Sequence, residues 1–379
     1  MITILIFIAV LGLLVFVHEL GHFLVAKRSG MQVDEFGFGF PPRVIGFYTG
    51  PNGKKVVFGP KTPPDALGTV YSINAIPLGG FVKIVGENND EPDNPNSFSK
   101  KSFFARLATL LAGVTMNVVL AWVLLTIVLF VGVPTVFDAE TTLPAGAQMT
   151  TPKVTIVEVK PESPAARAGL QIGDVVVKLD EAGVTSVREI QEYILPRKGS
   201  TIQFSIERGD APLQIAVASL AEPPAGEGPT GIALGTVGKL SYPWYKAPVV
   251  ALSFTGSQLW AIVEGLGQMV SGGVELSQVG GPVKIAQLTG QASRLGFVYL
   301  LQFAAFLSLN LAVLNALPIP ALDGGRVLFL LIEKIRRKPN NPQLEQTVNV
   351  VGFLALLLLM VVVTVNDFNG FSFIGKLFK

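Results

Sequence analysis

The feature that most constrains this chain is an uncharged apolar run, Ile2–Val17, that leads directly into His18-Glu19-Leu20-Gly21-His22. At about 1.5 Å per residue, residues 1–26 are long enough for a helix that crosses a bilayer. No basic region precedes the run and no small-residue cleavage site follows it. We therefore expect a retained membrane helix here rather than a signal peptide.

His18 and His22 are the only histidines in the chain, and they are spaced for one face of a helix. Side chains four residues apart share a face, so both imidazoles can reach one metal ion. Glu19 then lies beside that face, where it could accept a proton from a metal-bound water. Such a motif also occurs by chance, but two histidines and a glutamate in an apolar span are costly unless they are paired or liganded. We predict a zinc site with His18 and His22 as ligands.

The missing cysteines decide what completes this site. The chain contains none, so disulfides and thiolate zinc sites are excluded, and with both histidines used a third protein ligand has to be Asp or Glu. Of the 379 residues, 50% are hydrophobic and 15% charged, and the net charge is +2. This composition is too apolar for an ordinary soluble domain, and its scattered basic residues argue against a nucleic-acid partner.

Uncharged runs and the segments between them predict a polytopic α-helical membrane protein with about four transmembrane helices. Short strand-like runs at 69–73 and 81–85, separated by Pro77-Leu78-Gly79-Gly80, predict a membrane-associated β-hairpin. The expected order is a first membrane helix at 1–26, a cytoplasmic or reentrant β region at 27–102, a second membrane helix at 103–137, an extracytoplasmic α+β domain at 138–240, an amphipathic membrane-associated segment at 241–294, a third membrane helix at 295–325, a cytoplasmic basic loop at 326–346, and a fourth membrane helix with a tail at 347–379.

Asp323 can supply the carboxylate that is expected as the third metal ligand. It follows the third apolar run in a segment broken by Pro and Gly, Leu317-Pro318-Ile319-Pro320-Ala321-Leu322-Asp323-Gly324-Gly325. Irregular backbone at membrane depth is tolerated only where it is buried in protein or lines a cavity. We predict Asp323 as the third metal ligand.

The membrane topology tests this choice, because His18 and Asp323 can share a metal only at one depth. Lys27-Arg28 and the cluster Lys334–Lys338 are expected on the cytoplasmic side. The helices that carry the two ligands then run in the same direction, and the α+β domain lies outside. Residues 248–275 could form a third crossing or an amphipathic surface helix, but a crossing would place Asp323 on the wrong face. Four spans are therefore expected, with the site near the cytoplasmic face of the membrane.

Two further features leave alternatives open. Asn117 lies within the second apolar run, and its spacing favours a structural hydrogen bond to a neighbouring helix over a role at the metal. The inserted domain contains Ser163-Pro164-Ala165-Ala166-Arg167-Ala168-Gly169-Leu170 and resembles a PDZ domain of bacterial proteases. Such domains bind extended peptides along a sheet edge, and a substrate C-terminus is a possible ligand. A cap or size filter that binds nothing is the alternative.

The whole chain resembles the site-two protease family of intramembrane zinc metalloproteases, and most closely the bacterial branch that cleaves anti-sigma factors and signal-peptide remnants. The resemblance rests on His18-Glu19-Leu20-Gly21-His22, the segments at 77–83 and 112–117, the PDZ-like insert and Asn315-Ala316-Leu317-Pro318-Ile319-Pro320-Ala321-Leu322-Asp323-Gly324.

The resemblance implies that His18, His22 and Asp323 bind zinc and that Glu19 is the general base. It implies that Asn117 and Asn315 contact the substrate backbone or the oxyanion. It also implies that the substrate can pair with a strand edge at Gly79, Gly80, Phe81, Val82 and Lys83. The expected substrates are single-span membrane proteins whose ectodomain has already been cut, within the lipid bilayer.

Two departures from the family pattern concern the substrate rather than the ligands. The chain has room for one PDZ domain where enterobacterial members have two, and it has Gly113-Val114 where the family usually has Gly-Pro. The rival interpretations are a metal transporter and a non-catalytic membrane adaptor built around the PDZ domain.

Overall fold

Two units make up the structure, a computed structural model that describes residues 2–61, 63, 65–87, 94–137, 143–209, 211–224, 226–271 and 280–369. The first unit combines Met1–Leu125 with Ala251–Lys379, and the second, an inserted domain, comprises Thr126–Val250. The tail predicted after residue 369 lies outside the described residues.

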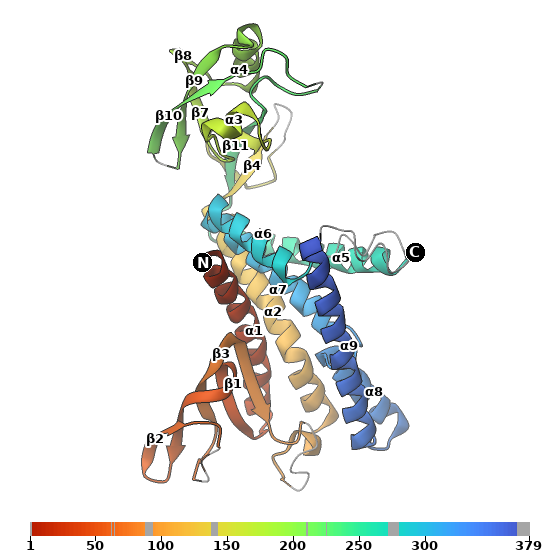
Figure 1. Cartoon of the computed structure of the whole chain (residues 1–379). Helices are drawn as coiled ribbons and strands as arrows, with labels where there is room; N and C mark the ends of the chain where they lie inside the picture. Colours follow the sequence, from red (N-terminus) through yellow and green to blue (C-terminus); the bar gives the residue numbers. More distant parts are fainter. Residues whose placement is uncertain are drawn as a thin grey trace. The chain divides into compact units, whose positions relative to one another are not determined.

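Long apolar helices dominate the first unit (Figure 1). They are α1 (Ile2–Arg28), α2 (Phe103–Val131), α7 (Phe297–Ala316) and α9 (Pro342–Asn369). Helices of 20 to 29 residues extend about 30 to 44 Å, which is enough to cross the hydrocarbon core of a bilayer. Glycines with positive φ follow two of them, Gly30 (+68°) after α1 and Gly132 (+102°) after α2, and such residues commonly end helices.

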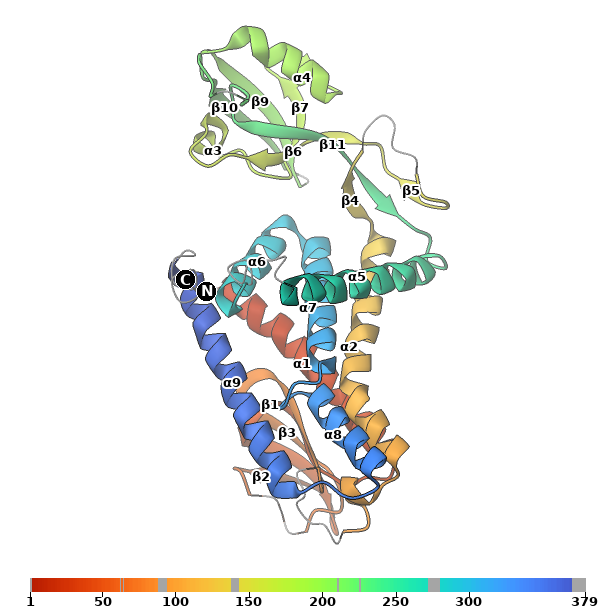
Figure 2. The same cartoon turned by 90° about the vertical axis from the view of Figure 1, so that its right-hand side faces the viewer.

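A fifth helix, α5 (Ala247–Val270), is also long and apolar enough to cross a membrane among the described residues. It is the least apolar of the five. In Figures 1 and 2, α5 lies across the direction of α2 and α7, whereas those two helices run along the bundle. The number of spans therefore stays a prediction, and it depends on whether α5 inserts.

The segment predicted as a basic loop is largely helical, which corrects the expected boundaries. Helix α8 (Asp323–Arg336) begins at the predicted metal ligand, and α9 already begins at Pro342. The sequence of α8 has an apolar side that packs on the bundle through Leu330, which is buried. An amphipathic helix satisfies its own backbone hydrogen bonds, so it is favoured over a loop beside a membrane. Residues 241–294 likewise contain two helices, α5 and α6 (Pro282–Leu295).

The β region is a sheet of β2 (Gly53–Phe58), β1 (Val33–Gly50) and β3 (Val70–Ile84), in that order. The two strand-like runs of the predicted hairpin both belong to β3, and they do not pair with each other. Both instead register with β1, where Phe36 is opposite Val82 as well as Tyr71. The predicted hairpin is thus corrected to one long strand that bends around another.

The inserted domain is an antiparallel sheet with two short helices, α3 (Pro164–Ala168) and α4 (Val187–Ile194). The sheet order is β10-β9-β7-β6-β11-β4, with two further short strands. The strands are β4 (Val133–Val136), β5 (Gln148–Met149), β6 (Lys153–Val159), β7 (Val175–Leu179), β8 (Ala182–Gly183), β9 (Thr201–Arg208), β10 (Ala211–Ala218) and β11 (Ile232–Ser241).

Local sequence explains how α3 forms between Ser163 and Gly169. The Ser163 hydroxyl accepts a hydrogen bond from the Ala166 amide (3.1 Å), Pro164 begins the helix, and Gly169 ends it with φ +89°. This is the preferred order of capping residues. The core beneath is fully buried and contains Ile156, Leu179, Ile190, Ile202, Phe204 and Ile206.

Candidate metal centre

Helix α1 brings the two histidines together on its buried face. The residues His18 and His22 are 6% and 7% exposed, and their Nε2 atoms lie 3.2 Å apart. The ring centroids are 4.8 Å apart. This is the arrangement expected from a spacing of four residues on a helix.

Asp323 completes the group from the first turn of α8. Its Oδ2 lies 3.0 Å from His18 Nε2 and 3.4 Å from His22 Nε2. The chain reaches it through Leu317–Leu322, an irregular connection between α7 and α8. The predicted ligands His18, His22 and Asp323 are thus brought together, and they form the group of three potential metal ligands found in the described part of the chain.

The protonation of His22 shows what this group can hold. Its Nδ1 lies 2.8 Å from the Thr109 carbonyl oxygen, which only accepts hydrogen bonds, so Nδ1 carries the hydrogen in the neutral ring and Nε2 presents a lone pair. That lone pair faces Asp323 Oδ2, a buried oxygen without a hydrogen-bond partner. Three electron-rich atoms this close favour a cation between them. Ligand atoms around a tetrahedral zinc are about 3.3 Å apart, so the residues fit zinc.

Asn117 lies beside His18 rather than in an open space. It is 0% exposed, and its Nδ2 lies 3.2 Å from His18 Nδ1. Its Oδ1 has no hydrogen-bond partner in the described part of the chain. A histidine that binds metal through Nε2 carries its hydrogen on Nδ1, and a half-turn of the amide would let Oδ1 accept it. Ser308 Oγ donates to the Asn117 carbonyl (2.8 Å) and ties α7 to α2 at this point.

Two glycines let α2 approach the histidines. A Cβ at Gly113 would lie 2.4 Å from His22 Nε2 and 2.6 Å from His18 Cε1. A Cβ at Gly21 would lie 2.4 Å from the Ala112 carbonyl oxygen. All three distances are too short for a real Cβ, so α1 and α2 can pack this closely only with glycine at these positions.

The connection that carries Asp323 is held by α9. Ala321 has φ +75°, an uncommon conformation for a residue with a Cβ, and its amide donates to Asn349 Oδ1 (3.1 Å). A Cβ on Gly352 would lie 2.6 Å from Pro320 Cβ. Helix α9 therefore packs directly on the residues before the third ligand.

The remaining predicted residues lie on three elements, α1, α7 and β3. Glu19 follows His18 in α1, is half-buried, and makes no hydrogen bond or ion pair within the described ranges. Asn315 lies in the last turn of α7 and is half-buried. The predicted substrate strand belongs to the second half of β3, which crosses α1: a Cβ at Gly79 would lie 2.4 Å from Val15 Cβ, and one at Gly80 3.2 Å from Phe16 Cδ2.

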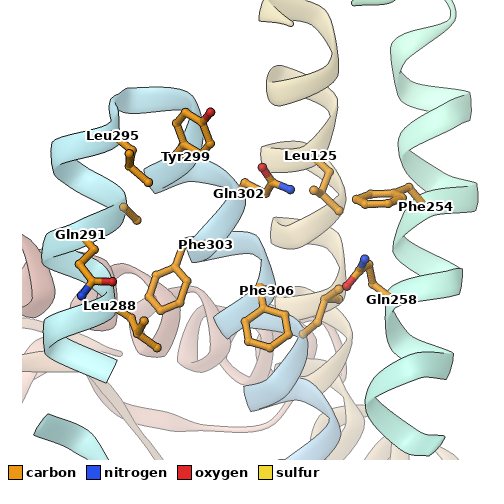
Figure 3. A pocket seen from close by; sticks show the side chains of 12 residues that line it. Leu125, Phe254, Gln258, Leu288, Gln291, Leu295, Tyr299, Gln302, Phe303 and Phe306 are labelled. Atoms are coloured by element: carbon orange, nitrogen blue, oxygen red, sulfur yellow. The ribbon is translucent and has the colours of Figure 1, made fainter. Parts of the chain in front are cut away.

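A cavity of about 380 Å³ lies elsewhere, among α2, α5, α6 and α7 (Figure 3). Apolar side chains such as Phe303 and Phe306 line it, together with Gln258, Gln291 and Gln302 from three different helices. It follows the first half of α7, whereas Asp323 comes after the end of that helix. The cavity contains none of the predicted site residues.

Sequence reasoning missed Thr109, Gly113, Asn349 and Gly352. Every residue has a backbone carbonyl, so the residue type at position 109 does not indicate that this carbonyl contacts a histidine. Glycines in the interior of apolar helices were the available signal, because glycine disfavours a helix unless close packing requires it.

Most of the chain is similar to known proteins. The family model for peptidase family M50 matches residues 6–359, a range that includes every member of the metal centre. The zinc metalloprotease RasP of Geobacillus kaustophilus is 32% identical over 448 residues, which covers 96% of this chain and 97% of that protein. Proteins provisionally named zinc metalloproteases are 32% identical in Clostridium acetobutylicum (96% of this chain, 97% of the relative) and 35% identical in Nostoc (95% and 94%).

Among solved structures, the PDZ domain of the SdrC-like protein of Listeria innocua is similar to part of the chain. The two are 26% identical with a TM-score of 0.20, and the likeness covers 22% of this chain and 92% of that domain.

Proposed function

The chain belongs to peptidase family M50, the site-2 protease family, and is a zinc-dependent metalloprotease; from this premise we propose that it hydrolyses peptide bonds within transmembrane segments of single-span proteins. The observation that carries the proposal is the convergence of His18, His22 and Asp323 from two helices, one of them long enough to span a bilayer. The substrates we infer are proteins whose ectodomain has already been cut, such as anti-sigma factors or signal-peptide remnants.

In this proposal His18, His22 and Asp323 hold zinc, and Asn117 and the Thr109 carbonyl orient the two rings. Bound zinc would supply Lewis acidity toward water and toward a peptide carbonyl. The Glu19 carboxylate takes a proton from the attacking water, whose oxygen bonds to the carbonyl carbon, and returns that proton to the leaving nitrogen as the C–N bond breaks. Asn315 is proposed to donate to the substrate backbone or to the developing oxyanion.

The edge of β3 is a suitable place for the substrate. Peptides in membrane helices have their amides paired internally, so the substrate has to unwind before it can react. Residues 80–84 pair with β1 on one side, and no strand of the described chain pairs with the other side. Gly79 and Gly80 cross α1 at Val15 and Phe16, which precede His18 by less than one helical turn, so we propose that a peptide added to this edge approaches the metal centre.

The proposed location is a bacterial cytoplasmic membrane. The basic ends of α1 and α8, at Lys27-Arg28 and Lys334–Lys338, favour the cytoplasmic side for the metal centre. The inserted domain would then be extracytoplasmic. We propose that it is a PDZ domain that either binds the trimmed end of a substrate or excludes substrates with intact ectodomains.

The rival interpretations are less well supported. A transporter is expected to place metal ligands along a path, whereas these three atoms converge on one point, and Glu19 directly follows His18 in the sequence. A non-catalytic adaptor would not need the paired histidines, and relatives along almost the whole chain are named metalloproteases.

Substituting Glu19→Gln tests the proposal. We expect cleavage of a membrane-anchored reporter to fall by about 100-fold or more, the scale of general-base catalysis, while zinc content measured by mass spectrometry stays at the wild-type level. Glu264→Gln is the matched control, because it also neutralises a carboxylate in an apolar helix. Full cleavage by Glu19→Gln would refute the role of Glu19, and zinc transport into liposomes without any cleavage would refute the protease.

A further inference from the structure

An open cleft of about 760 Å³ lies between the start of α2 and the end of α8. Both segments are at the same end of the bundle in Figures 1 and 2. The lining residues are Ser99, Lys101, Phe103, Arg106, Leu330, Glu333, Lys334, Ile335, Arg337, Lys338 and Pro339. Its volume is within the range of small-molecule sites.

The cleft carries positive charge that the protein itself does not neutralise. Glu333 is its one acidic lining residue, and both of its oxygens bind Arg106 (2.8 and 3.1 Å). The other four cations, Lys101, Lys334, Arg337 and Lys338, form no ion pair in the part of the chain that the structure describes. Lys101 donates to Asn96 (3.3 Å), and Lys334 lies 5.3 Å from the Phe103 ring centroid. Four uncompensated cations around one hollow favour an anion.

Apolar surface adjoins this charge. Ile335, which lines the cleft, is 81% exposed, and Phe104, at the start of α2, is 75% exposed. A small soluble anion would gain no binding energy from contact with these apolar side chains. A phospholipid needs both, since its phosphate seeks cations and its acyl chains seek apolar contact at the point where a helix enters the bilayer.

We propose that this cleft is a binding site for the headgroup of an anionic phospholipid. Its phosphate lies among Lys101, Lys334, Arg337 and Lys338, and its acyl chains follow Phe104 and Ile335 into the bilayer. The lipid joins the two elements that lead to the metal centre, because α2 carries Thr109 and Asn117 and α8 begins with Asp323. The proposal concerns lipid recognition and does not depend on where substrates are cut.

The test measures binding of phosphatidylglycerol and phosphatidylcholine to the delipidated full chain by native mass spectrometry. The cleft variant combines Lys334→Gln, Arg337→Gln and Lys338→Gln. The control variant combines Lys54→Gln, Lys100→Gln and Arg336→Gln, which removes the same charge from residues outside the cleft. We expect each removed cleft cation to weaken phosphatidylglycerol binding about fivefold, and the control variant to bind like the wild type.

Three results would overturn the proposal. They are equal binding of phosphatidylcholine, equal weakening in the control variant, and displacement of phosphatidylglycerol by millimolar inorganic phosphate, which would indicate a site for a soluble anion. Zinc content and circular dichroism of both variants show whether the fold is retained.

Discussion

At the scale of single residues, the absence of a side chain at Gly113 makes room for the metal centre. We predict that Gly113→Ala loses zinc and cleavage activity together, because the new Cβ would occupy space within 2.4 Å of His22 Nε2. Metal analysis and reporter cleavage check this. Gly256→Ala is the control, since a Cβ there meets nothing within 4 Å and alanine raises helix propensity equally in both variants. Normal zinc content in Gly113→Ala would contradict the close packing of α2 on α1.

The convergence of His18, His22 and Asp323 was predictable from the sequence, whereas the residues that support them were not. Counting two histidines and no cysteine forced a carboxylate, and membrane depth selected Asp323. Spacing alone favoured a structural role for Asn117, and the structure places it against His18. The Thr109 carbonyl and Asn349 were missed because each contact has a backbone group as one partner, and such contacts depend on how helices pack rather than on any motif.

Asp180, in the inserted domain, allows a prediction about pH. Hydrogen bonds from the Gln203 amide (2.9 Å) and the Tyr193 hydroxyl (2.8 Å) lower the pKa of its carboxyl. Because the folded-state pKa is below the unfolded value of about 3.9, this contribution to stability is present above about pH 4 and is lost as the pH falls through the folded-state pKa. We expect Asp180→Ala to lower the free energy of unfolding at pH 7 by about 1 kcal/mol and to weaken its acid dependence.

Urea unfolding of the inserted domain between pH 2 and 7 checks the Asp180 prediction, with pH values taken to bracket the carboxyl range. Glu181→Ala is the control, because this neighbouring acid is exposed. An unchanged acid dependence in Asp180→Ala would contradict the assignment.

At the scale of elements, α9 acts on the metal centre through the connection that precedes α8. We predict that Asn349→Ala lowers zinc affinity and activity by about 10- to 100-fold, the usual effect of removing a group that supports a metal ligand. The Ala321 amide would lose its acceptor and Asp323 its fixed position. Zinc release to a chelator measures the effect.

Asn310→Ala is the matched control for Asn349, because the Asn310 amide hydrogen-bonds only to Phe306 within its own helix among the described contacts. Equal zinc release from both variants would mean that α9 does not position Asp323.

The β region shows where periodicity misleads. Runs at 69–73 and 81–85 were correctly predicted as extended, but their partner was misjudged, because Gly37, Gly39, Pro41 and Pro42 make the central strand resemble a turn. Alternation marks which residues are in strands, whereas register depends on long-range pairing. In the corrected pairing, residues 80–84 pair with β1 on one side, and the other side is the edge that the family resemblance assigns to the substrate.

At the scale of the whole molecule, the order of the membrane helices and the inserted domain was predictable. Long apolar runs and the basic residues that flank them can be read from the sequence, however the helices pack. The role of α5 was not, since a moderately apolar helix suits both a crossing and the membrane surface. The proximity of Asp323 to His18 favours a surface position for α5. If α5 crossed the membrane between α2 and α7, the direction of α7 would be reversed and Asp323 would be separated from His18.

The central claim is that the bond cut lies inside a membrane span. The most direct test is the intact mass of products from a single-span reporter incubated with the full chain in lipid nanodiscs. We predict new termini within the apolar span of the reporter, and no such products from Asp323→Ala, which removes a zinc ligand. Termini confined to the soluble flanks, or an unchanged product pattern with Asp323→Ala, would contradict the account.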